Sequence, residues 1–140
     1  MNTLLAIAYR CHFTASILLA LMGLVYLRRR EFMPYHAAAL GQPWEQLEGP
    51  ARTLCLASMR IIGSAWLAMA VSLAILLRHG FRAGLRWAIY GVPLVGLTLS
   101  IPTLLAVLYV RSKTRASPPW PPLAVLVVLF LTGLLLSILA

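Results

Sequence analysis

The C-terminal stretch PLAVLVVLFLTGLLLSILA, residues 122–140, contains no charged side chain. An apolar run of about 18 residues or more is long enough to cross the roughly 30 Å hydrocarbon core of a bilayer as an α-helix. A helix also pairs its own backbone polar groups, which lipid cannot do. This stretch therefore predicts a membrane-spanning helix.

Three further apolar runs precede it, and they predict spans at about 4–27, 54–77 and 87–110. Of the 140 residues, 61% are hydrophobic and 11% are charged, whereas soluble domains carry about 25% charged residues. The runs are continuous and lack the two-residue alternation of a barrel strand. We therefore expect an all-α fold, with one transmembrane domain that occupies residues 1–140 and forms a four-helix bundle.

The longest polar segment, EFMPYHAAALGQPWEQLEGPART, joins the first two spans at residues 31–53. Pro43 suits the first turn of a short helix. Leu40, Trp44 and Leu47 recur at spacings of four and three, as on one helical face. We therefore expect a short amphipathic segment on the membrane surface, with Trp44 at headgroup level.

Glycine and proline mark two other features of the predicted helices. Gly49 followed by Pro50 indicates the end of the short helix and the start of the next one. The third span contains several residues that kink or locally open a membrane helix: Gly91, Pro93, Gly96 and Pro102.

The distribution of basic residues predicts the orientation. Twelve Lys and Arg against three acids give a net charge of +9, and they cluster between the apolar runs, which favours contact with anionic lipid headgroups over nucleic acid. Four spans place both termini on one side with four basic residues, and seven lie on the other. The positive-inside rule then predicts a bacterial inner membrane protein with both termini outside.

Arginines at the span ends are candidate ligands for a lipid or an anionic amphiphile. Ionisable side chains within a span are costly and for that reason often functional. Arg60 lies inside the second span and Arg10 inside the first, while Arg52 and Trp44 lie at the membrane surface. The alternative interpretation is that Arg60 extends to the headgroups or pairs with Glu45 or Glu48.

Histidines suggest two candidate metal sites. His12 and His79 are expected near the same membrane face, where two imidazoles can ligate haem b or a metal ion. His36, Glu45 and Glu48 form a second group, although their spacing matches no metal-binding motif. The alternative interpretation is that these side chains are interface anchors or hydrogen-bond a neighbouring helix. We therefore predict no cofactor, and haem b or a metal ion is kept as the alternative.

Small residues recur along three of the spans. They are Ser64, Ala68 and Ser72 in the second, Gly133 and Ser137 in the fourth, and Ser16, Ala20 and Gly23 in the first. Such stripes let helices approach closely, within one chain or between chains.

Several enzyme classes lack their required residues here. The sequence has no Asp, and its three Glu side chains all lie in residues 31–53. A membrane-embedded carboxylate for proton-coupled multidrug transport, the Asp-rich motifs of phospholipid synthases and an Asp-containing triad are all missing. The two cysteines, Cys11 and Cys55, are expected near opposite faces and form no redox pair.

The segment FMPYHAAALGQPWEQL resembles segments of small bacterial membrane proteins of unknown function, and the four-span layout resembles that of DoxX-like proteins. These resemblances imply a small multi-pass membrane protein without implying an activity. From the residues we expect a non-catalytic accessory or scaffold subunit that contacts a protein partner or further copies of itself. The alternatives are a lipid or anionic-amphiphile binding or transport module, or a haem or metal redox protein.

Overall fold

The structure is a computed structural model that describes residues 2–140, and these residues are helical or lie in short turns and loops. Four helices are long and apolar enough to cross a membrane, which confirms that part of the sequence prediction. They are α1 (Thr3–Arg28), α3 (Gly49–Leu76, continued by the π-helical turn η2, Leu77–Phe81), α4 (Arg86–Lys113) and α5 (Trp120–Ile138). A short helix, α2 (Pro34–Leu40), and a 3-10 turn, η1 (Trp44–Gln46), connect α1 to α3.

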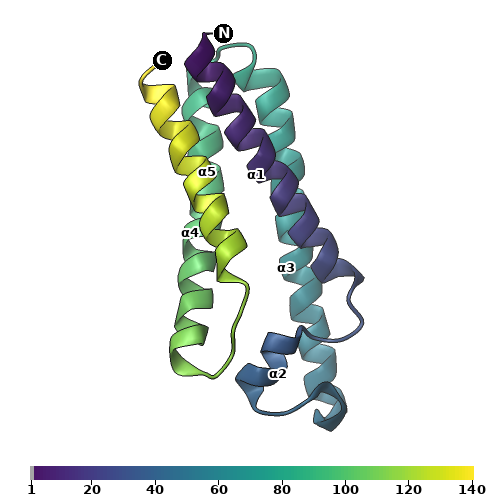
Figure 1. Cartoon of the computed structure of the whole chain (residues 1–140). Helices are drawn as coiled ribbons and strands as arrows, with labels where there is room; N and C mark the ends of the chain where they lie inside the picture. The colour runs from purple at the N-terminus through teal and green to yellow at the C-terminus, as the bar shows by residue number, and fades with distance from the viewer. Residues whose placement is uncertain (1) are drawn as a thin grey trace.

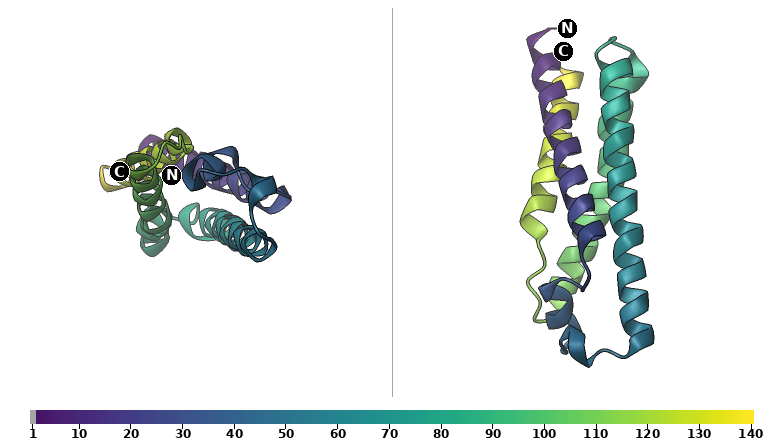
Figure 2. Two further views of the ribbon diagram at one scale, coloured as in Figure 1. Left: turned by 90° about the horizontal axis from the view of Figure 1, so that it is seen from below. Right: turned by 90° about the vertical axis from the view of Figure 1, so that its right-hand side faces the viewer.

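The long helices lie side by side (Figures 1 and 2). Helix α1 packs along both α3 and α5, and α4 packs along α5, whereas α3 and α4 contact each other little. The two chain ends meet at one end of the molecule, where Nδ2 of Asn2 donates a hydrogen bond to the carbonyl oxygen of Ala140 at 3.0 Å. We call this the terminal end, and the opposite one the α2 end.

Unequal helix lengths shape the α2 end. At about 1.5 Å per residue, α4 with 28 residues is roughly 42 Å long, and α5 with 19 residues is roughly 28 Å long. Because both reach the terminal end, α5 stops well short of α4 at the α2 end (Figure 2). Helix α2 and the proline-rich connector before α5 occupy the space that remains.

Glycines allow the closest helix contacts. A Cβ atom at Gly23 of α1 would lie 2.8 Å from the carbonyl oxygen of Gly63 on α3, and one at Gly63 would lie 2.9 Å from the carbonyl oxygen of Gly23. The two backbones therefore touch, as small residues permit in membrane helices. The stripe predicted in the first span is thus used for packing inside the molecule.

The connection between α1 and α3 differs from the prediction. The helix begins at Pro34, not at Pro43, and Pro43 precedes only the three-residue turn η1. Gly41, with φ +72°, ends α2 in the left-handed conformation, so Leu40 and Leu47 do not share one helical face. Leu40 is 52% exposed and Leu47 is buried. The single amphipathic stripe was therefore wrong.

The helices of the second and third spans can be compared with the sequence. Helix α3 starts at Gly49 with Pro50 in its first turn, as the Gly-Pro pair predicts, and so extends five residues beyond the span start expected at Leu54. Helix α4 runs without interruption through Pro93 and Pro102. The expectation of a locally opened third span is not met, since its helix continues on both sides of each proline.

Candidate functional site

A cavity of about 240 Å³ lies between the long helices near the α2 end. We call it the central cavity. Its walls come from α1, α2, α3, α4, the connector before α5 and the first turns of α5. Most of the lining side chains are apolar, among them Met22, Trp66, Val107 and Leu123. Helices α3 and α4 both contribute walls and contact each other little, so the cavity lies beside a loosely packed pair of helices.

A second cavity of about 390 Å³ adjoins the first on the side of α2 and α3. We call it the lateral cavity. His36, Ile62 and Val110 line both cavities, so they form the partition between them. The lateral cavity is also bordered by Leu40 and Cys55. The two cavities together therefore extend from the interior of the molecule to its side.

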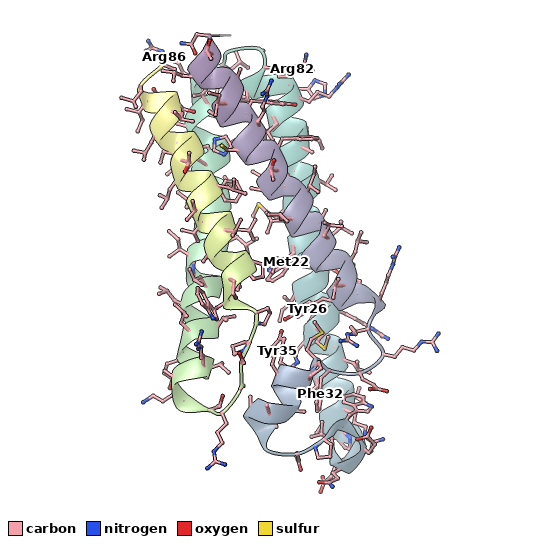
Figure 3. The ribbon with its side chains drawn as sticks, viewed as in Figure 1. Met22, Tyr26, Phe32, Tyr35, Arg82 and Arg86 are labelled. Carbon is pink, nitrogen blue, oxygen red and sulfur yellow. The ribbon has the colours of Figure 1, made fainter. Side chains whose placement is uncertain are left out.

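The central cavity has a polar end, formed by two tyrosines. The hydroxyl groups of Tyr26 on α1 and Tyr35 on α2 are hydrogen-bonded to each other. In Figure 3, Met22, Tyr26 and Tyr35 follow one another toward α2, between the pair α1 and α3 and the pair α4 and α5. Burial, and next the hydrogen bond with Tyr26, raises the pKa of Tyr35, so this phenol stays protonated at neutral pH. The pair also joins α2 to α1.

His36 is the third polar side chain at this end. Its Nδ1 accepts a hydrogen bond from the backbone N–H of Met33 at 3.3 Å, which caps the start of α2. A neutral imidazole whose Nδ1 accepts carries its proton on Nε2. Burial lowers the pKa of His36, so the neutral form is favoured. The ring packs against Tyr35, with 4.3 Å between the ring centroids.

Arg60 and Arg10, the predicted ligand-binding arginines inside spans, are both exposed and line neither cavity. Arg60 lies eleven residues after the start of α3 at Gly49, which is about 16 Å along the helix. Since α3 is longer than a bilayer core is thick, this position is compatible with a guanidinium that reaches the headgroups.

Arg52 and Trp44, the two candidate ligand-binding residues at the membrane surface, contact each other, and the contacts of Arg52 stabilise the chain itself. The Nε of Arg52 donates to the carbonyl oxygen of Leu47 at 2.8 Å, and an Nη donates to that of Glu45. The guanidinium also lies over the Trp44 ring, 5.8 Å from its centroid. Arg52 therefore holds the connection before α3 in place, and at least two of its five N–H donors are engaged there.

The structure separates His12 from His79. His12 is fully buried at the terminal end, between Phe81 and Phe130, with ring centroids 5.7 and 5.8 Å away. Its two ring nitrogens have no hydrogen-bond partner among the described residues. His79 lies two residues before Phe81 but is exposed. His12 is thus a side chain of the helix core.

The second candidate metal group is also dispersed. His36 is half-buried and uses Nδ1 to cap α2, whereas Glu45 and Glu48 are exposed. Within residues 2–140, no group of three or more His, Cys, Asp or Glu side chains is arranged to hold a metal ion.

Sequence reasoning missed the residues that form the cavity. Tyr26 and Tyr35 lie on either side of the arginine cluster 28–30, and Trp66 lies in the middle of an apolar run. Aromatic residues at the ends of spans usually indicate the membrane interface, so this signal alone does not select them. Their meeting depends on the fold-back of α2, which places Tyr35 under the end of α1 (Figure 3).

The comparisons with known proteins add no relative. No protein-family model, no curated protein and no solved structure matches the chain. Its function is therefore inferred from its own residues and geometry.

Proposed function

We propose that the protein is a multi-pass membrane protein whose four long helices cross the bilayer as a bundle, and that it binds an amphiphile by its apolar chain. One observation carries the proposal. The central cavity, about 240 Å³, is lined mostly by apolar side chains of α1, α3, α4 and α5, and Tyr26, Tyr35 and His36 border it where it meets α2. Ligand sites typically combine apolar walls with a few placed polar groups.

The outer surface supports the membrane location. Large apolar side chains face outward along the long helices, with Ile61 70%, Leu105 61% and Val128 59% exposed. An apolar surface of this extent is costly in water and favourable in lipid. The positive-inside rule then places the α2 end in the cytoplasm of a bacterial cell and both termini outside. A C-terminal alkaline phosphatase fusion should accordingly be active, and an inactive one would reverse the orientation.

The packing supports entry from the surrounding lipid. Because α3 and α4 contact each other little, an apolar chain can insert between them without breaking a tight helix interface. Ile62 of α3 and Val110 of α4 border both cavities on this route. Arg60 and Arg10 are exposed and do not line the central cavity, so we do not propose that they bind the ligand.

Trp66 provides a direct test, because it lines the central cavity and is only 5% exposed. Trp44, Trp87 and Trp120 are replaced by Phe, and the protein is placed in vesicles that contain phospholipid with brominated acyl chains. Bromine quenches tryptophan fluorescence at short range. If an acyl chain enters the cavity, the emission of Trp66 is quenched.

A matched pair of substitutions separates the cavity from the outer surface. Val107→Phe fills the cavity wall, whereas Val128→Phe adds the same bulk at a position that is 59% exposed. The first should relieve the quenching of Trp66 and the second should not. A variant that retains only Trp87, which is 62% exposed, should be quenched in every case. Equal quenching of Trp66 with and without Val107→Phe would refute the proposal.

A protein-partner role is the second candidate, and one feature favours it. The stripes in α1 and α5 pack inside the molecule, where Gly23, Gly133 and Ser137 are buried, but Ser64, Ala68 and Ser72 of α3 are exposed. This outward stripe would let another helix approach closely, as an accessory subunit requires.

Native mass spectrometry of the protein, gently extracted from its own membranes, tests this second role. A second polypeptide in fixed ratio that Ala68→Leu releases would establish it. A monomer without a polypeptide partner would rule it out, and a small added mass on that monomer would support the amphiphile instead.

A further inference from the structure

The polar end of the central cavity offers more hydrogen-bond donors than the protein itself uses. In the Tyr26–Tyr35 pair one hydroxyl donates to the other, so one of the two hydroxyl hydrogens is left over, whichever tyrosine is the donor. His36 uses Nδ1 as an acceptor, so its Nε2–H is a second donor. The remaining hydroxyl on the wall, that of Thr103, already donates to the carbonyl oxygen of Leu99 at 2.7 Å.

The donors lie near one another and border the same space. Tyr26, Tyr35 and His36 all line the central cavity. The hydroxyls of the tyrosines touch, and the Tyr35 and His36 ring centroids are 4.3 Å apart. Three polar side chains therefore share one end of a cavity whose other walls are apolar except for Thr103, whose hydroxyl donates within its own helix. Such an arrangement selects a head group as well as a chain.

The charge of the cavity restricts the ligand further. None of the lining side chains that the structure describes is Lys, Arg, Asp or Glu. Burial favours the neutral forms of both Tyr35 and His36 by raising the pKa of the first and lowering that of the second. An anionic head would lose its hydration there without gaining a cation, which is costly. A neutral oxygen acceptor would gain hydrogen bonds without that loss.

Building on the proposed function, we infer that the amphiphile has an uncharged head with a carbonyl-type acceptor oxygen, as in an ester, ketone or quinone. The left-over tyrosine hydroxyl and Nε2–H of His36 hold this oxygen, and the apolar chain extends past Met22 toward Trp66. This ligand class replaces the anionic amphiphile expected from the arginines.

Competition against the brominated lipid tests the head group. The protein that retains only Trp66 is placed in brominated vesicles, and hexadecyl acetate, hexadecyl phosphate or hexadecane is added at increasing mole fraction. These probes share one chain and differ in the head. Hexadecyl acetate should restore Trp66 fluorescence at the lowest mole fraction. Compared with hexadecane, the mole fraction needed for half-restoration should be about fivefold lower for each hydrogen bond that the acetate gains.

A double variant assigns the effect to the tyrosines. Tyr26→Phe with Tyr35→Phe removes both hydroxyls and keeps both rings, so the preference for the acetate over hexadecane should fall about fivefold. Tyr109→Phe is the control, because Tyr109 is 64% exposed and lies outside the cavity. An unchanged level of quenching by brominated lipid alone shows that the cavity of the double variant is intact.

The outcomes separate the head-group inference from the proposed function. If the phosphate displaces best, or if all three probes act equally, the cavity binds chains but the neutral head is wrong. If the double variant keeps the full preference for the acetate, the tyrosines do not hold the head. If brominated lipid never quenches Trp66, both the inference and the proposed function fail.

Discussion

The two ends of the molecule are built differently, although the same four helices form both. At the terminal end, His12, Leu77 and Phe130 are completely buried, and the rings of Phe81 from η2 and Phe130 from α5 pack against the His12 ring of α1. At the α2 end, α2 has no buried residue, and two cavities of about 240 and 390 Å³ lie beside it.

Helix length and residue size together explain the contrast. At the terminal end, glycines face large rings, as Gly96 faces Phe130 and Gly133 faces His12, so bulky and small side chains interlock. At the α2 end, α5 stops early and a seven-residue helix takes its place. Close packing at the terminal end thus holds the helices together, so the α2 end can contain cavities. We propose that the ligand binds at the α2 end.

The largest difference between the ends should appear when one phenylalanine is truncated at each. Phe130→Ala removes a fully buried ring from the terminal end and should lower the free energy of unfolding by about 3–5 kcal/mol. Phe32→Ala at the α2 end should cost clearly less, because its cluster contains few buried residues and can relax. Unfolding in mixed micelles with an increasing mole fraction of a denaturing detergent measures the unfolding free energy of both variants. Equal losses would mean that the two ends are equally rigid.

The next effect concerns the glycines that bring α1 and α3 together. Gly23→Ala should destabilise the protein by about 1–3 kcal/mol, because its Cβ would meet backbone atoms of Gly63 and Leu67 that cannot rotate away. Gly91→Ala is the matched control, with no atom within 4 Å of the new Cβ. It should stabilise α4 by about 0.5–1 kcal/mol, since alanine favours the helix. The same unfolding assay should give opposite signs, and matching signs would contradict the packing described.

A smaller gain is expected at His12. Its ring nitrogens are buried without a hydrogen-bond partner among the described residues, and an unsatisfied buried polar group costs about 1–3 kcal/mol. His12→Leu keeps much of the volume and removes the polar atoms, so it should raise the unfolding free energy by about 1 kcal/mol. A loss of stability would contradict this expectation, and absorption spectra of the purified protein would then test whether His12 binds haem.

The long helices could be predicted from the sequence, because hydrophobic length alone determines them. The cavity could not, since apolar periodicity does not show which face of α1 turns toward Tyr35. The connection before α3 was misjudged because Pro34 and Pro43 are equally good helix starts, and only Gly41 decides between them. The sequence analysis selected Arg60 and Arg10 as rare charges within spans, yet both side chains face outward and line neither cavity.

The smallest expected effect is a pH dependence confined to α2. Burial lowers the pKa of His36 in the folded protein. The imidazole that caps α2 therefore binds a proton less readily than the same imidazole exposed to solvent. The cap is therefore fully present above the ordinary histidine pKa of about 6.5, and it weakens as the pH falls through the lowered value. Protonated Nδ1 no longer accepts the N–H of Met33, and the neighbouring Tyr35, whose pKa is raised by burial, carries no charge in this range.

Hydrogen exchange of the α2 amides, expressed as protection factors at pH 7 and pH 5, measures this loss. Protection should fall at pH 5 in α2 and stay constant around Phe130, because the neighbouring His12 makes no side-chain hydrogen bond among the described residues that protonation could break. His36→Gln keeps an acceptor that does not titrate, so its α2 protection should be the same at both pH values. If protection of the unmodified protein is equally insensitive to pH, the Tyr26–Tyr35 hydrogen bond holds α2 without the histidine cap. The tyrosines would then account for both the attachment of α2 and the head-group site.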